Sequence, residues 1–267
     1  RTKVDLGDNA DIYLARVNWS ADGETLYVQR QSRDQKTVDL LSVDPATGAS
    51  RVIVSQTSDA WVPLTHAFKA LEDGRFIWAS QETGWNHLYL YERDGRMIRP
   101  ITWGPWAVKG LNGVNQETGE VFFTASFGYA ERPEGVSGGH SACPMPGGQV
   151  AMCDVQGETP TTQRLWRASL EGQNGRFVPV TPDGGWWSAS MNKTGTAFVG
   201  NYSDLNTPPQ SGLYRADGTF VRWIEENRLD ESHPYWPYAS RRGEVTYGTL
   251  DSDGEMLVWQ MTTPPGF

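Results

Sequence analysis

Turn glycines followed by alternating strands recur along the chain and constrain its fold more than any other feature. Five such units are WSADGETLYVQ, LEDGRFIWAS, NQETGEVFFTAS, MNKTGTAFVGN and SRRGEVTYGTL. Their glycines are separated by 51, 45, 76 and 48 residues and stand at Gly23, Gly74, Gly119, Gly195 and Gly243. Pairs such as Asp-Gly and Thr-Gly supply the positive φ that a two-residue hairpin turn requires. Each unit therefore predicts a β-hairpin.

A second series of turns runs in phase with the first. VDLLSVDPATG, HLYLYERDG, RLWRASLEGQNG and GLYRADG end at Gly48, Gly95, Gly175 and Gly218, and a short apolar strand follows each of them. Two hairpins per period make a four-stranded antiparallel sheet, and a four-stranded repeat of about 45 residues is typical of a propeller blade. The sequence predicts an all-β propeller chain with about four blades, over 11–57, 58–103, 104–183 and 184–227, and a final hairpin over 235–263.

The longest interval marks an insertion in the third blade. The surplus lies in residues 127–163, which are rich in Gly and Pro and show no strand periodicity, so we expect a long loop between two strands. The insertion contains Cys143 and Cys153, the two cysteines of the chain. They predict a disulfide, which would stabilise the loop by about 2–3 kcal/mol at most. A disulfide fits an oxidising compartment such as the bacterial periplasm.

Charge and histidine spacing exclude several classes of function. The formal net charge is −9 with a pI near 5.0, and no stretch concentrates Lys and Arg, so nucleic acid is not an expected partner. No apolar run approaches the roughly 18 residues of a membrane-spanning helix. His66, His87, His140 and His233 lack the spacing of metal ligands, so we expect neither a metal site nor a cofactor. His87 lies in the strand HLYLY and is expected to pack or hydrogen-bond there.

Four segments carry a signal more specific than the blade pattern: DIYLARVNW, YVQRQSRDQKTVDLLSVDPATG, FIWASQETGWNHLYLYERDG and RPITWGPWAV. They resemble the propeller of bacterial dipeptidyl peptidase IV enzymes, of the prolyl oligopeptidase clan. The resemblance implies an unclosed, eight-bladed propeller of which this chain is the C-terminal half, followed by an α/β-hydrolase domain of the same protein. Such serine peptidases release Xaa-Pro or Xaa-Ala dipeptides from peptide N-termini.

The resemblance also implies which functional residues the chain should contain. The family's catalytic Ser, Asp and His belong to the hydrolase domain, and its paired glutamates, which hold the substrate ammonium, precede a segment like DIYLARVNW. Both sets are expected outside this chain, whose two ends we expect to be cuts in a longer protein. The chain is therefore expected to have no catalytic residue and to gate and position peptide substrate, with residues 61–68 nearest to it.

Three motifs could imitate a functional site. Residues 135–139 match G-x-S-x-G around Ser137, but the prolines on both sides forbid the helix that a nucleophile elbow needs. Glu225 and Glu226 imitate a glutamate pair around a cation, but they follow the last strand of the fourth blade, and adjacent acids typically form a solvated face. The aromatic pairs could bind peptide or sugar, but packing of the core and between blades is the favoured interpretation. They are Trp186 with Trp187 and Tyr235 with Trp236.

Two other functions stay open from the sequence. A stand-alone propeller could be a binding module for protein or peptide, and a closed ring of blades would support that alternative. A propeller glycosidase would need carboxylates across a central cavity, for which the chain has no motif. An arc of four blades also predicts exposed strand edges, and exposed edges favour self-association.

Overall fold

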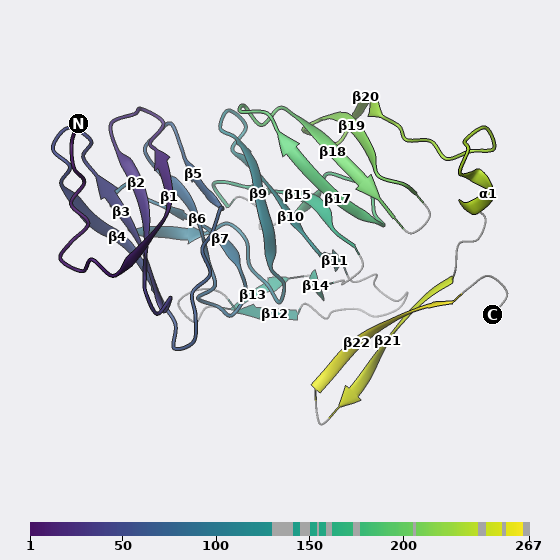
Figure 1. Ribbon diagram of the computed structural model, residues 1–267, viewed down its shortest axis with the longest axis horizontal. Coiled ribbons are helices and arrows are strands. Elements are labelled where there is room, and N and C mark those ends of the chain that lie inside the picture. Colours follow the sequence, from purple (N-terminus) through teal and green to yellow (C-terminus); the bar gives the residue numbers. More distant parts are fainter. Residues whose placement is uncertain are drawn as a thin grey trace.

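The two series of turns fold into antiparallel sheets that follow one another along the chain (Figure 1). The computed structural model describes residues 1–129, 141–144, 150–153, 155–158, 162–172, 177–204, 207–239, 244–252 and 255–263. Four of the sheets have four strands, and their order in space follows the sequence in each of them. The predicted all-β class and the unclosed row of four-stranded sheets are confirmed.

The strands of the four sheets are two to eight residues long. The first sheet contains β1 (Ile12–Trp19), β2 (Leu26–Ser32), β3 (Thr37–Val43) and β4 (Ser50–Thr57), and the second contains β5 (Phe68–Ala70), β6 (Phe76–Ser80), β7 (His87–Tyr91) and β8 (Met97–Pro100). The third contains β9 (Val108–Asn115), β10 (Glu120–Ala125), β15 (Arg164–Ser169) and β16 (Val178–Pro179). The fourth contains β17 (Trp186–Met191), β18 (Ala197–Ser203), β19 (Gln210–Arg215) and β20 (Phe220–Glu225).

Glycine is required where the turn between the third and fourth strands approaches the preceding sheet. Gly95 has a φ of 93° in the β7–β8 turn, and a Cβ there would clash with the carbonyl oxygen of Ile53 on β4. Gly218 has a φ of 90° in the β19–β20 turn, and a Cβ would clash with the carbonyl oxygen of Val180. Both positions combine a left-handed backbone with a close approach, which only glycine tolerates. At these two positions of the second glycine series, the turn therefore lies against the sheet before it.

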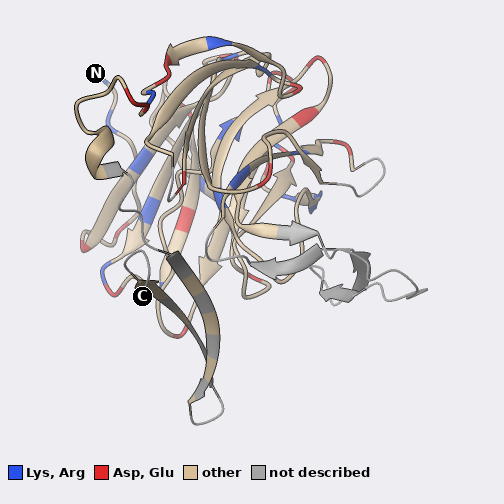
Figure 2. Cartoon of the chain, turned by 90° about the vertical axis from the view of Figure 1, so that its right-hand side faces the viewer, with Lys and Arg blue, Asp and Glu red and all other residues tan. Residues whose placement is uncertain are grey.

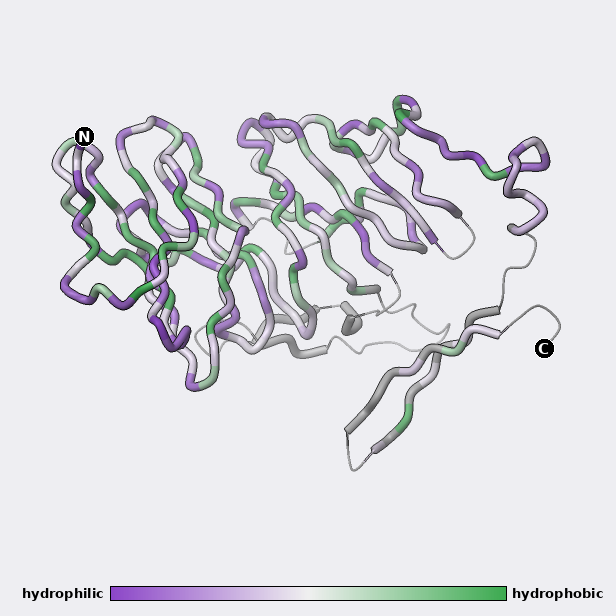
Figure 3. Tube along the Cα trace, in the orientation of Figure 1, coloured by the Kyte–Doolittle hydropathy of each residue, from purple (hydrophilic) through white to green (hydrophobic). Residues whose placement is uncertain are grey.

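The core lies between neighbouring sheets rather than within a single sheet. Successive residues of β10 point to opposite faces, so that Phe123 packs toward the second sheet and Phe122 toward the fourth. Between the second and third sheets, Phe127 stacks on Trp106 and Trp166 with ring centroids 4.1 and 4.0 Å apart. Figure 3 shows apolar residues along the strands and hydrophilic residues in the turns. Each fully buried aromatic side chain stabilises the fold by about 1.5–3 kcal/mol.

The insertion in the third sheet is not the strandless loop that the sequence predicts. β11 (Phe127–Tyr129) pairs with β14 (Val155–Glu158), and β12 (Ser141–Pro144) pairs with β13 (Val150–Cys153). Both pairs lie in sequence between β10 and β15. These two strands are neighbours in the third sheet. We expected a loop because this segment lacks alternating apolar residues. Short strands can nevertheless pair through main-chain hydrogen bonds without that alternation.

The end of the chain also differs from the expected hairpin over 235–263. A short helix, α1 (Trp236–Ala239), occupies the start of that range, and the strands are β21 (Glu244–Ser252) and β22 (Glu255–Thr263). This hairpin extends away from the four sheets (Figure 1). In the described part of the chain, no helix is long and apolar enough to cross a membrane. Acidic and basic residues are interspersed on the side of the molecule that Figure 2 shows.

Candidate functional site

The connections between successive sheets lie at one end of the strands. Because neighbouring strands are antiparallel, the second and fourth strands of a sheet finish at the same end of the sheet, and the next sheet begins there. The crossover between the first two sheets (residues 58–67), the β6–β7 turn (residues 81–86) and the start of β9 therefore lie together.

A pocket of ≈ 330 Å³ lies where these segments meet, and we call it the crossover pocket. Residues 62–67 of the crossover form one wall, and residues 109–111 at the start of β9 form another. Gln56, Asn86 and residues 79–81 at the end of β6 complete the lining. Its volume falls in the range of known small-ligand sites.

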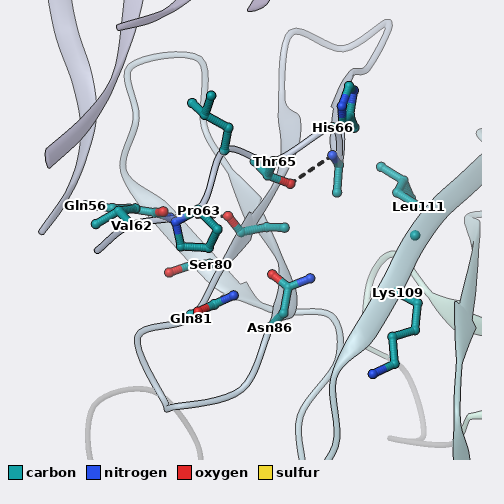
Figure 4. Close-up of a pocket in the computed structure, with 14 residues that line it drawn as sticks. Gln56, Val62, Pro63, Thr65, His66, Ser80, Gln81, Asn86, Lys109 and Leu111 are labelled. Atoms are coloured by element: carbon teal, nitrogen blue, oxygen red, sulfur yellow. Dashed lines mark hydrogen bonds between the residues drawn. The ribbon is translucent and has the colours of Figure 1, made fainter. Parts of the chain in front are cut away.

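The lining of the crossover pocket is neutral or positively charged. Lys109 and Leu111 lie on the opposite side of the pocket from Gln56 and Val62 (Figure 4), and His66 also lines it. The guanidinium of Arg16, on β1, donates from Nε to Nδ1 of His66 at 3.2 Å. Among the described residues, no Asp or Glu lines this pocket. The pocket therefore suits a ligand that accepts hydrogen bonds, such as the carbonyl groups of a peptide.

Buried carboxamides hold the crossover in place. Gln29 and Gln31 lie on β2, on the same face as the core residue Tyr27, and are only 1% and 3% exposed. Gln29 Nε2 donates to the carbonyl oxygen of Thr65 at 3.1 Å, and Gln31 Nε2 donates to that of Val62 at 2.9 Å. A buried amide left without a partner costs about 1–3 kcal/mol. These two bonds therefore fix the pocket wall to the first sheet.

Comparison with known proteins places the chain in a family. Residues 1–134 match the family model described as the dipeptidyl peptidase IV (DPP IV) N-terminal region. The chain belongs to this family. A probable dipeptidyl peptidase 4 of Aspergillus flavus is 23% identical over 99% of this chain and 31% of its own length. A dipeptidyl peptidase 4 of Arthroderma otae is 26% identical over 43% of this chain and 16% of its own length.

Two solved structures have the same fold. The crystal structure of Porphyromonas gingivalis dipeptidyl peptidase 4 matches with a TM-score of 0.74 and 21% identity, over 96% of this chain and 32% of that one. A putative dipeptidyl aminopeptidase IV from Bacteroides ovatus matches with a TM-score of 0.70 and 20% identity, over 99% of this chain and 36% of that one. The chain thus spans about a third of the length of these proteins and corresponds to part of the DPP IV propeller region.

His87 lies in the core, as predicted, and is not among the residues that line the crossover pocket, although its cross-strand partner Ser80 is. Its Nε2 donates to the carbonyl oxygen of Gly104 at 3.0 Å, which fixes the tautomer because a carbonyl oxygen can only accept. Nδ1 then accepts from the Thr102 hydroxyl at 3.1 Å, and the ring packs edge-on against Trp106. Burial lowers the pKa of His87 to about 4. His87 therefore acts as a neutral structural residue.

The other histidines also have local partners where they are described. His66 faces Arg16, and Nδ1 of His233 accepts the backbone N–H of Tyr235 at 3.2 Å before α1. His140 lies outside the described residues. No group of three His, Cys, Asp or Glu side chains in the described ranges is placed to hold a metal ion.

The motifs that could imitate a site are not brought to the crossover pocket. Glu225 accepts the backbone N–H of Asn227 at 2.9 Å at the end of β20, in the fourth sheet. Ser137 and the rest of residues 135–139 lie outside the described residues. Cys143 faces Ala151 and Cys153 faces Ser141 in the β12–β13 ladder, and their side chains lie outside the described part.

The expectation that both aromatic pairs pack into the core is wrong for two of their residues. Trp187 is 5% exposed and belongs to the core between the third and fourth sheets, but its neighbour Trp186 is 46% exposed. Tyr235 is 68% exposed. Adjacent residues of a strand point to opposite faces, so only one member of the Trp186–Trp187 pair can enter this core.

Sequence reasoning missed the residues that build the pocket wall. It placed residues 61–68 near the substrate without assigning any of them to a pocket, and the structure places residues 62–67 in the crossover pocket lining. The overlooked signal is the pattern of Tyr27, Gln29 and Gln31 at alternate positions of a strand. Amides on the same face as a core tyrosine must find buried partners.

Proposed function

We propose that the chain is the non-catalytic propeller part of a dipeptidyl peptidase IV-like serine exopeptidase. In this proposal the crossover pocket forms part of the wall that gates and positions a peptide, and a C-terminal α/β-hydrolase domain of the same protein cleaves Xaa-Pro or Xaa-Ala dipeptides from its N-terminus. The observation that carries the proposal is the match to the DPP IV N-terminal region. The names of the similar proteins agree with it.

The chemistry of the pocket supports binding rather than hydrolysis. A serine peptidase needs a nucleophile, a base within hydrogen-bond reach and an orienting acid. The Thr65 hydroxyl accepts the backbone N–H of Ala67 at 2.9 Å, and the Ser80 hydroxyl accepts that of Glu82 at 3.3 Å. His66 faces a guanidinium rather than a carboxylate. No such set of three groups forms among the described residues of the pocket.

The test compares the purified chain with the intact parent protein on a chromogenic Gly-Pro substrate. We expect turnover by the parent that a serine-directed covalent inhibitor abolishes, and no turnover by the chain. Turnover by the repurified chain that is lost in Ser137→Ala would overturn the proposal, because the propeller itself would then be the enzyme. An inactive parent would favour the alternative of a stand-alone binding module for protein or peptide.

The positioning role has its own test in the parent protein. Leu111→Trp fills the crossover pocket from β9, and we expect it to raise KM for a longer peptide several-fold with a smaller change in kcat. Val178→Trp, at a surface position 38% exposed on β16, is the matched control. Unchanged KM in Leu111→Trp, with the fold intact, would contradict a role of this pocket in positioning peptide.

We also propose an extracytoplasmic, periplasmic location with a Cys143–Cys153 disulfide. The pairing of β12 with β13 supports it, because it brings the two strands that carry the cysteines next to each other.

A further inference from the structure

A second pocket adjoins the crossover pocket. It has a volume of ≈ 400 Å³ and is lined by the end of β4, by Trp61 to Pro63 of the crossover, and by the start of the β6–β7 turn up to Glu82. We call it the Trp61–Glu82 pocket. It shares Gln56, Val62, Pro63, Ser80 and Gln81 with the crossover pocket, so the two pockets adjoin each other. Their charges differ, because Glu82 is the charged residue of this lining.

Trp61 presents a fixed aromatic surface at this pocket. Its side chain is 56% exposed, although its indole Nε1–H donates to Oε1 of Gln35 at 2.9 Å. The backbone is anchored too, since Val62 N–H donates to the carbonyl oxygen of Gln35 at 2.9 Å. Gln35 adopts a φ of 61°, a left-handed conformation that is uncommon for a residue other than glycine. The hairpin of the first sheet therefore holds the indole by its edge and leaves much of its surface to solvent.

The carboxylate of Glu82 forms no ion pair with a described residue. In the described part of the chain no Lys, Arg or His lies in ion-pair distance of it, although the structure pairs other acids, such as Asp39 with Arg30 and Glu171 with Arg75. Glu82 is exposed, but neighbouring protein partly desolvates its carboxyl group and raises its pKa. The negative potential of Glu82 also raises the pKa of Tyr89, after the larger effect of burial. A carboxylate in this setting gains more from a cationic partner than a fully hydrated one does.

We propose that the Trp61–Glu82 pocket binds the cationic side chain of a peptide, with arginine preferred over lysine. A guanidinium can stack on the indole face and also donate two parallel hydrogen bonds to the carboxylate, which an ammonium cannot do. The proposal rests on the proposed function in taking the ligand to be a peptide. The crossover pocket, with Lys109 and His66, is electrostatically unsuited to the same side chain.

Binding of blocked peptides to the chain tests this site without any hydrolysis. The probes are acetyl-Gly-Gly-Arg-Gly-Gly-amide and the same peptide with citrulline, which has the shape of arginine without its charge. Isothermal titration calorimetry measures both affinities. We expect the arginine peptide to bind about tenfold more tightly, from the cation–π and charge-assisted contributions together.

Three variants assign the preference to this pocket. Glu82→Gln keeps the size of the side chain and should bring the arginine-to-citrulline ratio close to one, and Trp61→Ala should lower it several-fold. Glu117→Gln is the matched control, because Glu117 is also an exposed carboxylate in a turn. It lies in the β9–β10 turn, at the end of the third sheet opposite the pockets. It should leave the ratio unchanged.

Two results would overturn the proposal: equal or undetectable binding of both peptides by the unaltered chain, or an arginine preference that persists in Glu82→Gln. Either result leaves the exopeptidase proposal standing, because the Gly-Pro assay of the parent does not use this pocket's charge. Conversely, an inactive parent would refute the exopeptidase proposal without affecting the measured arginine preference.

Discussion

Acidification should destabilise the chain through His87. The neutral imidazole is buried, with Nε2–H donating to Gly104 and Nδ1 accepting from Thr102. Its pKa falls from the ordinary value of 6.5 to about 4 in the fold, with desolvation as the main cause. The folded state therefore resists protonation, whereas the unfolded state binds a proton as the pH falls through 6.5. Stability is fully present above that pH and is lost as the pH falls toward 4.

The expected loss follows from the two pKa values. A shift of one pKa unit corresponds to about 1.4 kcal/mol, so linkage predicts that His87 removes about 2 kcal/mol of unfolding free energy between pH 8 and pH 5 and about 3 kcal/mol by pH 4. With an unfolding entropy of about 2.1 cal/mol/K per residue, 2 kcal/mol corresponds to a fall in Tm of about 4 °C.

Carboxylates also contribute to the pH dependence of stability, and replacing His87 by a side chain that does not titrate separates its contribution from theirs. His87→Gln retains an amide N–H that can reach Gly104, although this variant should be less stable than the unaltered chain at pH 8. Between pH 8 and pH 5, the variant should lose about 2 kcal/mol less unfolding free energy than the unaltered chain does. His66→Gln, at an exposed histidine, is the control and should retain the full pH dependence. Thermal unfolding followed by circular dichroism at both pH values measures the difference. Equal pH dependence in His87→Gln and the unaltered chain would refute the reasoning.

Two further predictions concern the crossover and the insertion. Gln31→Leu leaves the Val62 carbonyl without its buried partner and should lower the unfolding free energy by about 1–3 kcal/mol, as measured by urea denaturation. The control is Gln81→Leu, at an exposed position of the crossover pocket, which should change the unfolding free energy by less than about 0.5 kcal/mol. Mass spectrometry of the unreduced chain should find Cys143 and Cys153 linked, and two alkylatable thiols would contradict the disulfide.

The blade architecture could be predicted from sequence because each turn has a local chemical requirement. Gly95 and Gly218 need a left-handed backbone and meet a neighbouring carbonyl group, and both needs appear in the sequence as glycine at a fixed phase. The alternation of Phe122 and Phe123 between two cores follows in the same way from the period of a strand.

The pockets could not be predicted because their walls have no period. Residues 58–67 form no helix or strand, and their position depends on long-range bonds from Gln29, Gln31 and Gln35 of the first sheet. A polar residue on a strand is usually assigned to solvent, and only the fold shows that Gln29 and Gln31 are buried. The same limit applies to Trp61, whose exposure depends on a partner 26 residues away in sequence.

The outermost strand of the fourth sheet, β20, should drive self-association of the chain. Phe220, Val221, Trp223 and Ile224 are 45%, 48%, 39% and 55% exposed. Among the described strands β20 pairs with β19 alone, so its other edge presents backbone N–H and C=O groups. An apolar open edge pairs readily with another strand. Sedimentation velocity should therefore show dimers or larger species whose fraction rises with concentration. Ile224→Lys should weaken this association at least tenfold, because a charge on the edge opposes pairing, whereas Met97→Lys on the outer strand of the second sheet, β8, should not. A chain that stays monomeric at high concentration, or an association that Ile224→Lys leaves unchanged, would contradict the role of β20.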